Sequence, residues 1–364
     1  MTRLIQPCAE RTKGEKQKLM QTKLRVNNLS VSFNVREDVL RAVRGVSFEL
    51  NEGETLAIVG ESGSGKSVTS KAILGLLPKS AKIVSGEIFF GEDDLTKYGE
   101  REWTNVRGKK IAMVFQDPTA CLNPILRVGE QIVEGILAGE KHTPKNRAAA
   151  KEKAIKLLQE VGIPDAENRF RQYPFEFSGG MKQRIVIAIA LSQSPEILVC
   201  DEPTTALDVS VQAQILELIN GLKKERNLSV VFITHDLGVV ASMADRVAVM
   251  YAGKIVEYGK TEEIFYQPKH PYTWALLAAS PDLTTKDRLY EIKGTSPDLT
   301  KEIKGDAFAP RNEYALKIDF EEEPPFFKVS ETHFAATWLL DARAPIVHPP
   351  KAEKRSKRSR KNGE

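Results

Sequence analysis

Residues 60–67 have the composition of a phosphate-binding loop. The stretch GESGSGKS matches the pattern G-x-x-x-x-G-K-[ST], follows an apolar β-type run and precedes a segment with helical spacing. Glycines let backbone N–H groups curl around phosphate oxygens, and the first turn of the helix attracts anions. In such a loop the lysine reaches the β- and γ-phosphates and the serine can ligate Mg²⁺. The predicted nucleotide-binding residues are Gly60, Glu61, Ser62, Gly63, Ser64, Gly65, Lys66 and Ser67.

A pair of acidic residues ends a second apolar run, ILVCDE, at Asp201 and Glu202. In a phosphohydrolase the first carboxylate of such a pair would hold Mg²⁺ through water, and the second could act as a general base on the attacking water. Taken alone, an acidic pair at a strand end is often only a helix cap. The phosphate-loop motif in the same chain makes the catalytic interpretation the better one.

The stretch FSGGMKQR could form a second site for an anion. A serine and two glycines, Ser178, Gly179 and Gly180, stand at the start of an apolar helical segment, so that their hydroxyl and bare N–H groups can face phosphate. One nucleotide does not need two such sites from one chain. We therefore expect Ser178 to close over a nucleotide held by a partner subunit.

Together these motifs resemble those of the ATP-binding subunit of an ABC transporter. The resemblance covers about residues 24–259 and includes Gln116 in FQDP, Asp208 in TALD and His235 in ITHD, all in the family's order. Phe177 and Met181 stand where many families have Leu and Gln, but the phosphate-facing residues are intact. The resemblance implies ATP and Mg²⁺ as ligands.

The family's roles are expected at the matched positions. Gln116 would contact Mg²⁺ or the attacking water, and His235 would bond the γ-phosphate and orient Glu202. Asp208 would organise the dimer interface. Ser67, Gln116 and Asp201 are thus the expected metal-site residues. Phe33 is the candidate for stacking on adenine, although a core phenylalanine in a β-type run is the alternative.

The composition indicates a globular protein with one large domain and an appendage, or two domains. Of its 364 residues, 41% are hydrophobic and 28% charged, and the three cysteines form no CxxC pair. The longest apolar run, at residues 185–191, is too short to cross a bilayer. The tail at residues 351–364 holds seven basic and two acidic residues, which leaves the rest of the chain at a formal charge of −1. A general affinity for nucleic acid is not expected.

Alternating strand and helix patterns predict an α/β fold with a mainly parallel sheet covered on both faces. A helix should start at the phosphate loop and stop at Pro78. Between Pro118 and Pro195 strand patterns disappear, which predicts an all-helical insertion, with Gly162 as a helix C-cap. The resemblance adds a RecA-like core and a small antiparallel β-subdomain.

The expected domains are a mobile arm at residues 1–22, an ABC ATPase domain at 23–260 with its helical part at about 119–184, an extension at 261–350 and a basic disordered tail at 351–364.

The extension resembles that of the oligopeptide, dipeptide and nickel importer group through KHPYTWALLAASP. In HPYTWALL, a helix is expected to pack Trp274, Leu276 and Leu277 on the domain. Many members of the group hold an iron–sulfur cluster with four cysteines, whose positions here carry Asp306, Asn312, Asp319 and, for the fourth, Thr337.

Thiolates hold such clusters, so we expect no iron–sulfur cluster. A hard-cation site at these oxygen-bearing side chains is the weaker alternative. The segment is instead expected to be a scaffold packed by Phe308, Tyr314 and Phe320.

The predicted function is an ATP-hydrolysing subunit that drives oligopeptide import. Its expected partners are a second ATPase subunit, taken to be a different homologous chain, two membrane permease subunits and indirectly an external binding protein. The expected location is peripheral, on the cytoplasmic face of the cell membrane. Dipeptide or nickel import is an alternative. A soluble ABC ATPase acting on ribosomes or DNA is disfavoured, because the chain has one phosphate loop and lacks sustained heptads between Gln116 and Ser178.

Overall fold

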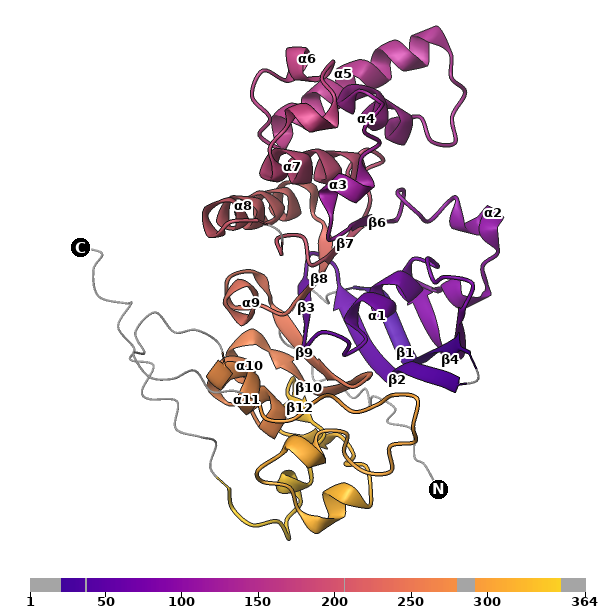
Figure 1. Ribbon diagram of the computed structural model, residues 1–364. Helices are drawn as coiled ribbons and strands as arrows, with labels where there is room; N and C mark the ends of the chain where they lie inside the picture. Colours follow the sequence, from indigo (N-terminus) through magenta and orange to yellow (C-terminus); the bar gives the residue numbers. More distant parts are fainter. Residues whose placement is uncertain (1–20, 37, 206, 280–291, 348–364) are drawn as a thin grey trace, which may run out of the picture.

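The computed structural model describes residues 21–36, 38–205, 207–279 and 292–347. These residues build two sheets and a helical unit (Figure 1). An eight-stranded sheet has the order β11-β12-β10-β9-β3-β8-β7-β6, and a four-stranded sheet has the order β2-β1-β4-β5. The helical unit and the C-terminal extension lie at opposite ends of the molecule, with the large sheet between them. The predicted mobile arm and basic tail lie outside the described residues, apart from residues 21 and 22.

The large sheet is parallel over β9, β3, β8, β7 and β6, and antiparallel where β10, β12 and β11 extend it. Every residue of β3, β7 and β8 is buried, as expected for parallel strands covered on both faces. The predicted mainly parallel sheet is confirmed. The strands are β3 (Thr55–Val59), β6 (Ile111–Val114), β7 (Ile197–Asp201), β8 (Ser229–Thr234), β9 (Arg246–Tyr251), β10 (Lys254–Lys260), β11 (Phe327–Lys328) and β12 (Phe334–Ala335).

The small sheet is antiparallel, as the family resemblance predicted. It packs on one face of the large sheet around α1 (Lys66–Ile73). This helix ends well before Pro78, so the prediction of its end was wrong. Gly75 takes a left-handed conformation and the N–H of Leu76 bonds the carbonyl of Lys71, which closes the helix early. The strands are β1 (Thr22–Val35), β2 (Asp38–Asn51), β4 (Ala81–Phe90) and β5 (Asp93–Asp94).

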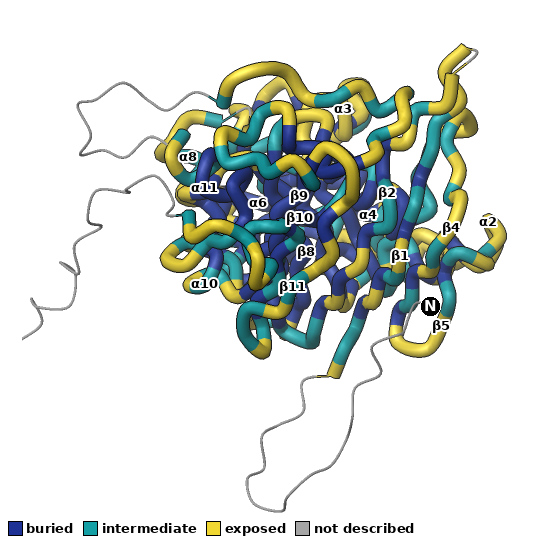
Figure 2. The backbone as a smooth tube through the Cα atoms, turned by 90° about the horizontal axis from the view of Figure 1, so that it is seen from below, coloured by how far each residue is buried: buried dark blue, intermediate teal, exposed yellow. Residues whose placement is uncertain are grey.

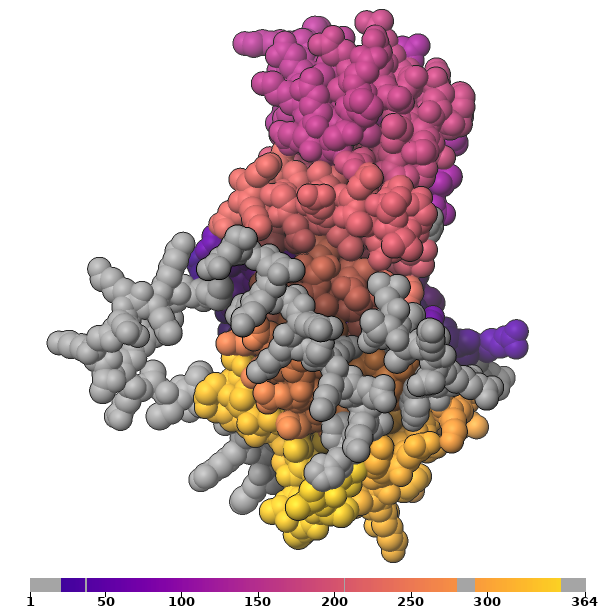
Figure 3. Space-filling model, turned by 90° about the vertical axis from the view of Figure 1, so that its left-hand side faces the viewer, coloured from indigo at the N-terminus to yellow at the C-terminus, as the bar shows by residue number. Residues whose placement is uncertain are grey.

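The helical unit forms a lobe of its own at one end of the molecule (Figure 3). Its apolar side chains join those of α8 in one core. Gly162, with a φ of +75°, follows the end of α5 as the sequence predicted. The helices are α3 (Pro118–Cys121), α4 (Val128–Ile136), α5 (Pro144–Glu160), α6 (Ala166–Arg169) and α7 (Gly179–Ala190); α2 (Glu100–Trp103), α8 (Val209–Arg226) and α9 (Leu237–Met243) lie outside the unit.

The C-terminal extension begins with two helices, α10 (Thr261–Tyr266) and α11 (Pro271–Ala279), and continues mostly as irregular chain. Its strand β12 pairs with β10, and Phe308 enters the core that covers one face of β3 and β9. Figure 2 shows buried backbone, in dark blue, around β9 and α11. Leu276 and Leu277 pack against this core, as predicted, whereas the buried Trp274 contacts Tyr314 and the carbonyl of Pro268 within the extension.

The prediction that Phe308, Tyr314 and Phe320 hold the extension was right for two residues. Phe308 is 2% exposed, and the ring of Tyr314 meets the edge of Trp274 at a centroid distance of 5.4 Å. Phe320 is wrong, because it is 56% exposed. Phe320 ends the short 3₁₀ helix Lys317–Phe320, which buries Asp319: the Asp319 carbonyl accepts the N–H of Asp306, and the next side chain, Phe320, faces solvent.

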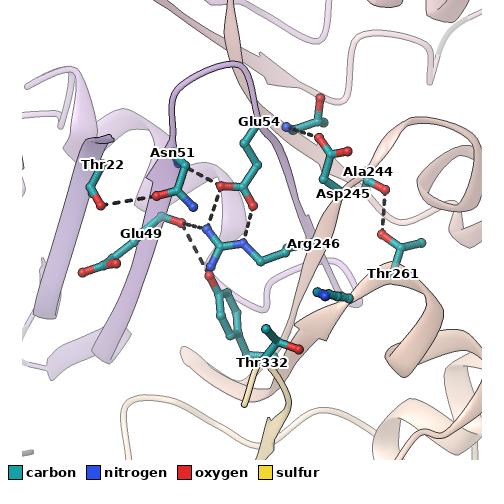
Figure 4. Close-up of polar contacts among 12 residues, drawn as sticks. Thr22, Glu49, Asn51, Glu54, Ala244, Asp245, Arg246, Thr261 and Thr332 are labelled. Carbon is teal, nitrogen blue, oxygen red and sulfur yellow. Dashed lines mark hydrogen bonds and ion pairs between the residues drawn. The ribbon is translucent and has the colours of Figure 1, made fainter. Parts of the chain in front are cut away.

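Polar contacts join the two sheets where β3 begins (Figure 4). The buried carboxylate of Glu54 pairs with the Arg246 guanidinium, which also donates to the carbonyl of Glu49 at 2.8 Å. The next residue of the chain after Glu54, Thr55, donates its N–H to the carboxylate of Asp245 at 2.8 Å. The strand that leads into the phosphate loop is therefore fixed at its start by charged side chains of Arg246, the first residue of β9, and of Asp245 just before it.

Candidate active site

The phosphate loop connects β3 to α1, and two of its glycines have no room for a side chain. A Cβ at Gly60 would lie 2.0 Å from the carbonyl oxygen of Met250. A Cβ at Gly65, whose φ is +101°, would lie 2.5 Å from the carbonyl oxygen of Ala42. The glycines of the motif are therefore required by close backbone contacts as well as by the ligand that the motif predicts.

Lys66 is a buried cation with main-chain partners. Its Nζ donates to the carbonyl oxygens of Gly60 at 2.7 Å and Glu61 at 2.9 Å. Burial lowers the pKa of Lys66. An ammonium that two main-chain carbonyls hold at the start of a helix suits the phosphates of a nucleotide.

Ser67 and Asp201 meet at the end of β7. The Ser67 hydroxyl donates to Oδ1 of Asp201 at 2.8 Å. Burial raises the pKa of Asp201. A hydroxyl and a carboxylate at hydrogen-bond distance supply the hard oxygen ligands that Mg²⁺ prefers, so the two residues fit the predicted metal.

Three predicted residues from separate segments come together around the next carboxylate. Gln116 Nε2 donates to Oε2 of Glu202 at 3.3 Å, and His235 Nδ1 lies 3.4 Å from its Oε1. Thr205, which the sequence did not single out, donates its hydroxyl to Oε2 at 2.9 Å. Both oxygens of Glu202 are thus oriented by side chains from the segments that follow β6, β7 and β8.

The backbone of Glu202 is itself constrained. It has a φ of +48°, a conformation that non-glycine residues rarely adopt. Its N–H bonds the carbonyl of Ile233 at 2.9 Å, which ties it to the end of β8. Strain of this kind persists where the surrounding structure fixes it, and it is common at functional sites.

The serine–glycine motif begins α7 at an exposed position. Ser178 and Gly179 are exposed, and the Ser178 hydroxyl caps the helix by accepting the N–H of Met181 at 3.4 Å. A Cβ on Gly180 would lie 2.4 Å from Val211 of α8, whereas one on Gly179 would meet only Leu207, at 3.6 Å. The first glycine therefore faces open space at a helix N-terminus.

Asp208 and Phe33 occupy less central positions. The Asp208 carboxylate caps α8 by accepting the N–H of Val211 at 2.9 Å, and this bond lowers the pKa of Asp208. Phe33 is half-buried in β1 and packs against the core under the small sheet. Its stacking on adenine stays a prediction.

At the four positions that carry cluster ligands in other members of the group, the side-chain oxygens accept hydrogen bonds from backbone N–H groups within three residues. Asp306 accepts the N–H of Phe308 at 3.0 Å, and Asn312 accepts that of Tyr314 at 2.9 Å. Asp319 and Thr337 likewise accept backbone N–H groups, at 2.6 and 3.3 Å. Across the described ranges no group of three or more His, Cys, Asp or Glu could hold a metal. Oxygens engaged in turns do not fit an iron–sulfur cluster, and the absence of one stays a prediction.

Replacing Asp306 should stabilise the protein at neutral pH. The side chain is 8% exposed, and burial raises the pKa of Asp306 to about 6. The folded state therefore binds a proton that the unfolded state has lost, and stability falls as pH rises from about 4 to about 6. Asp306→Asn keeps the acceptor for Phe308. It should raise the free energy of unfolding by about 1–3 kcal/mol at pH 7.5.

Urea unfolding at pH 7.5 and pH 4 measures this effect, and the gain should nearly vanish at pH 4. The control is Asp298→Asn, because the exposed Asp298 accepts from Thr300, which holds the pKa of Asp298 below its ordinary value. A gain of the same size at both pH values would contradict the account.

Sequence reasoning also missed two residues of the extension. Tyr272 and Arg311 bond Glu61 in the phosphate loop from 211 and 250 positions away in the chain. Tyr272 belongs to the predicted HPYTWALL helix, and Arg311 directly precedes Asn312, one of the four cluster-ligand positions. One sequence feature pointed toward a contact with the phosphate loop: both segments follow the predicted ATPase domain and so have to pack on some part of it.

The phosphate loop, the serine–hydroxyl and carboxylate pair and the oriented glutamate together define a nucleotide hydrolase of the P-loop class. The family model for "ABC transporter" matches residues 43–205, and that for "Oligopeptide/dipeptide transporter, C-terminal region" matches residues 256–318.

The chain is 56% identical to the oligopeptide transport ATP-binding protein OppD of Bacillus subtilis, over 93% of this chain and 95% of the relative. It is 57% identical to the dipeptide transport ATP-binding protein DppD of Lactococcus lactis, over 90% and 93%. The dimer of the ATP-binding cassette MJ0796 bound to ADP and Pi aligns with a TM-score of 0.58 and 27% identity, covering 65% of this chain and 98% of that one. The protein belongs to the ABC transporter ATP-binding subunits.

Proposed function

We propose that this chain binds and hydrolyses ATP to power the import of oligopeptides through an ABC transporter. The observation that carries the proposal is the oriented carboxylate of Glu202 beside the phosphate loop, in a chain with a peptide-transporter type of extension. Relatives named for oligopeptide transport, OppD of Bacillus subtilis and AmiE of Streptococcus pneumoniae, are both 56% identical to it.

In this proposal the loop amides and Lys66 bind the phosphates, and Phe33 stacks on the adenine. Ser67 and Asp201, with Gln116, would hold Mg²⁺, which neutralises charge on the phosphates when bound. Glu202 takes a proton from the attacking water as general base. His235 contributes by orienting Glu202 and bonding the γ-phosphate.

The exposed start of α7 supports a two-chain site. Ser178, Gly179 and Gly180 present a helix N-terminus outward, where it would meet the nucleotide of a second ATPase subunit. Asp208 lies next to this surface at the start of α8 and would order it. The cassette MJ0796 is dimeric in its solved structures.

The remaining partners follow from the class of transporter. Among the described residues no helix is long and apolar enough to cross a membrane. Because its relatives are named as ATP-binding proteins of transporters, we expect two permease subunits to form the translocation path, with the chain at the cytoplasmic face and residues 261–350 as its extension. The second ATPase would be a different homologous chain. Dipeptide import remains the nearest alternative substrate, because a DppD relative is as similar as OppD.

The test is recovery of a tagged copy from membranes in mild detergent. Two permease chains and a second ATPase should copurify, and reconstituted complex with its binding protein should hydrolyse ATP faster when peptides of about five residues are added. Stimulation by dipeptides or Ni²⁺ alone would assign one of the alternatives. Recovery on ribosomes or DNA without membrane subunits would overturn the proposal.

A further inference from the structure

The C-terminal extension holds the phosphate loop through one residue, Glu61. Arg311 donates from Nη1 to Oε2 at 2.7 Å and from Nη2 to Oε1 at 3.0 Å, which makes a bidentate pair. Ser296 donates its hydroxyl to Oε2 at 3.3 Å, and the Tyr272 hydroxyl accepts the backbone N–H of Glu61 at 2.8 Å. We refer to Tyr272, Ser296 and Arg311 as the loop clamp.

The guanidinium of Arg311 has a partner for each of its N–H groups. Besides the two bonds to Glu61, it donates to the carbonyls of Lys293 and Ile292, at 3.0 and 3.4 Å, and to the hydroxyl of Tyr251 at 3.2 Å. The side chain is 7% exposed, and the bond to Glu61 raises the pKa of Arg311. A lysine could not make these contacts, because its ammonium lacks the planar fork.

The loop clamp is attached to the large sheet through aromatic rings. The ring of Tyr272 lies 4.5 Å from that of Tyr251, the last residue of β9, and both rings lie 5.3 Å from Phe308. None of the three is more than 2% exposed. Tyr272 belongs to this packed core and Arg311 bonds Tyr251 within it, so two of the groups that bond Glu61 have a more rigid support than a free loop would give.

Glu61 in turn contributes to the position of Lys66. Its carbonyl accepts from the Lys66 ammonium, while its N–H is taken by Tyr272 and its carboxylate by Arg311. We infer that the loop clamp preorganises the phosphate loop, so that the extension sets the affinity for the nucleotide triphosphate. Preorganisation raises affinity because less ordering remains to be done on binding. The inference rests on the nucleotide site proposed above, and Tyr272, Ser296 and Arg311 are positioning residues in it.

The inference is tested by ATP titrations of the purified full chain and by steady-state kinetics of the assembled transporter. Glu61→Gln and Tyr272→Phe keep the shape of each side chain and should each raise KM for ATP about tenfold, equivalent to about 1.4 kcal/mol. The maximal rate should stay within about twofold, because the contact acts on binding and not on the reacting atoms. Arg311→Met should behave likewise. Combined with Glu61→Gln it should raise KM by less than the product of the two single effects, since both variants remove the Arg311–Glu61 pair, the contact of Arg311 with the loop.

The matched control is Glu323→Gln. Glu323 pairs with Lys254 of β10 at 2.5 Å, so this ion pair also joins the extension to the ATPase sheet but does not touch the loop. Loss of the Glu323–Lys254 ion pair should leave KM for ATP unchanged. An equal rise in KM for the control and the clamp variants would overturn the inference, because general loosening of the extension would explain it.

Lys66→Ala separates this inference from the proposed function. If Lys66→Ala binds ATP like the native chain, the proposed nucleotide site fails. If it loses ATP binding while Glu61→Gln, Tyr272→Phe and Arg311→Met keep the native KM, only the clamp inference is overturned.

Discussion

Glu202→Gln should lower the maximal rate of ATP hydrolysis about 10²–10⁴-fold while leaving ATP affinity nearly unchanged. The amide has the same size as the carboxylate and can keep a contact with Thr205, so the strained backbone of this residue need not move. It cannot accept a proton from water. The loss therefore falls on the chemical step and not on binding.

The measurement pairs ATPase kinetics of the assembled transporter with ATP titration of the purified chain. Glu196→Gln is the control, because this glutamate pairs with Lys23 at 2.7 Å on the surface and precedes the same strand. The control should be fully active. Turnover of Glu202→Gln within about threefold of native would contradict the assignment of Glu202 as general base.

Much of the fold could be predicted from the sequence because local patterns and global structure agree. Parallel strands buried on both faces must be continuously apolar, so the runs that became β3, β7 and β8 are visible without any contact information. The end of α1 and the exposure of Phe320 could not be predicted this way. Leu76 and Leu77 continue an apolar pattern that suits a helix, but they pack against the core from a turn after Gly75.

The residues of the candidate site likewise fall into those that a local motif predicts and those that only the folded structure brings together. Gln116, Glu202 and His235 are in recognisable motifs, and the structure brings the side chains of Gln116 and His235 within 3.4 Å of the Glu202 carboxylate. The contact of Arg311 with Glu61 had no such signal, because the two residues are 250 positions apart and neither belongs to a periodic segment. Such a long-range ion pair depends on how the extension packs on the ATPase domain, and the local spacing of residues does not predict that packing.

Gly179→Asp should abolish ATP hydrolysis by the transporter without weakening the fold. A carboxylate at the start of α7 would face the phosphates of the partner's nucleotide if the two chains close as proposed. Two like charges about 4 Å apart repel by about 4 kcal/mol at an effective dielectric of about 20, so the rate should fall about 10²–10³-fold. The same carboxylate favours the helix macrodipole and has room, since a Cβ there would meet only Leu207, at 3.6 Å. The melting temperature should therefore be unchanged or higher, which separates this effect from misfolding.

Gly179→Asn is the matched variant, because asparagine has the size of aspartate and no charge. It should retain at least about tenfold more activity than Gly179→Asp, since only the charged side chain is repelled. ATP binding by the isolated chain should be native in both variants, because the serine–glycine motif acts on a nucleotide held by the other subunit. Weakened ATP binding by the isolated Gly179→Asp chain would place the motif on the chain's own nucleotide instead. Equal activity of the two variants would show that charge at this helix N-terminus does not meet phosphate.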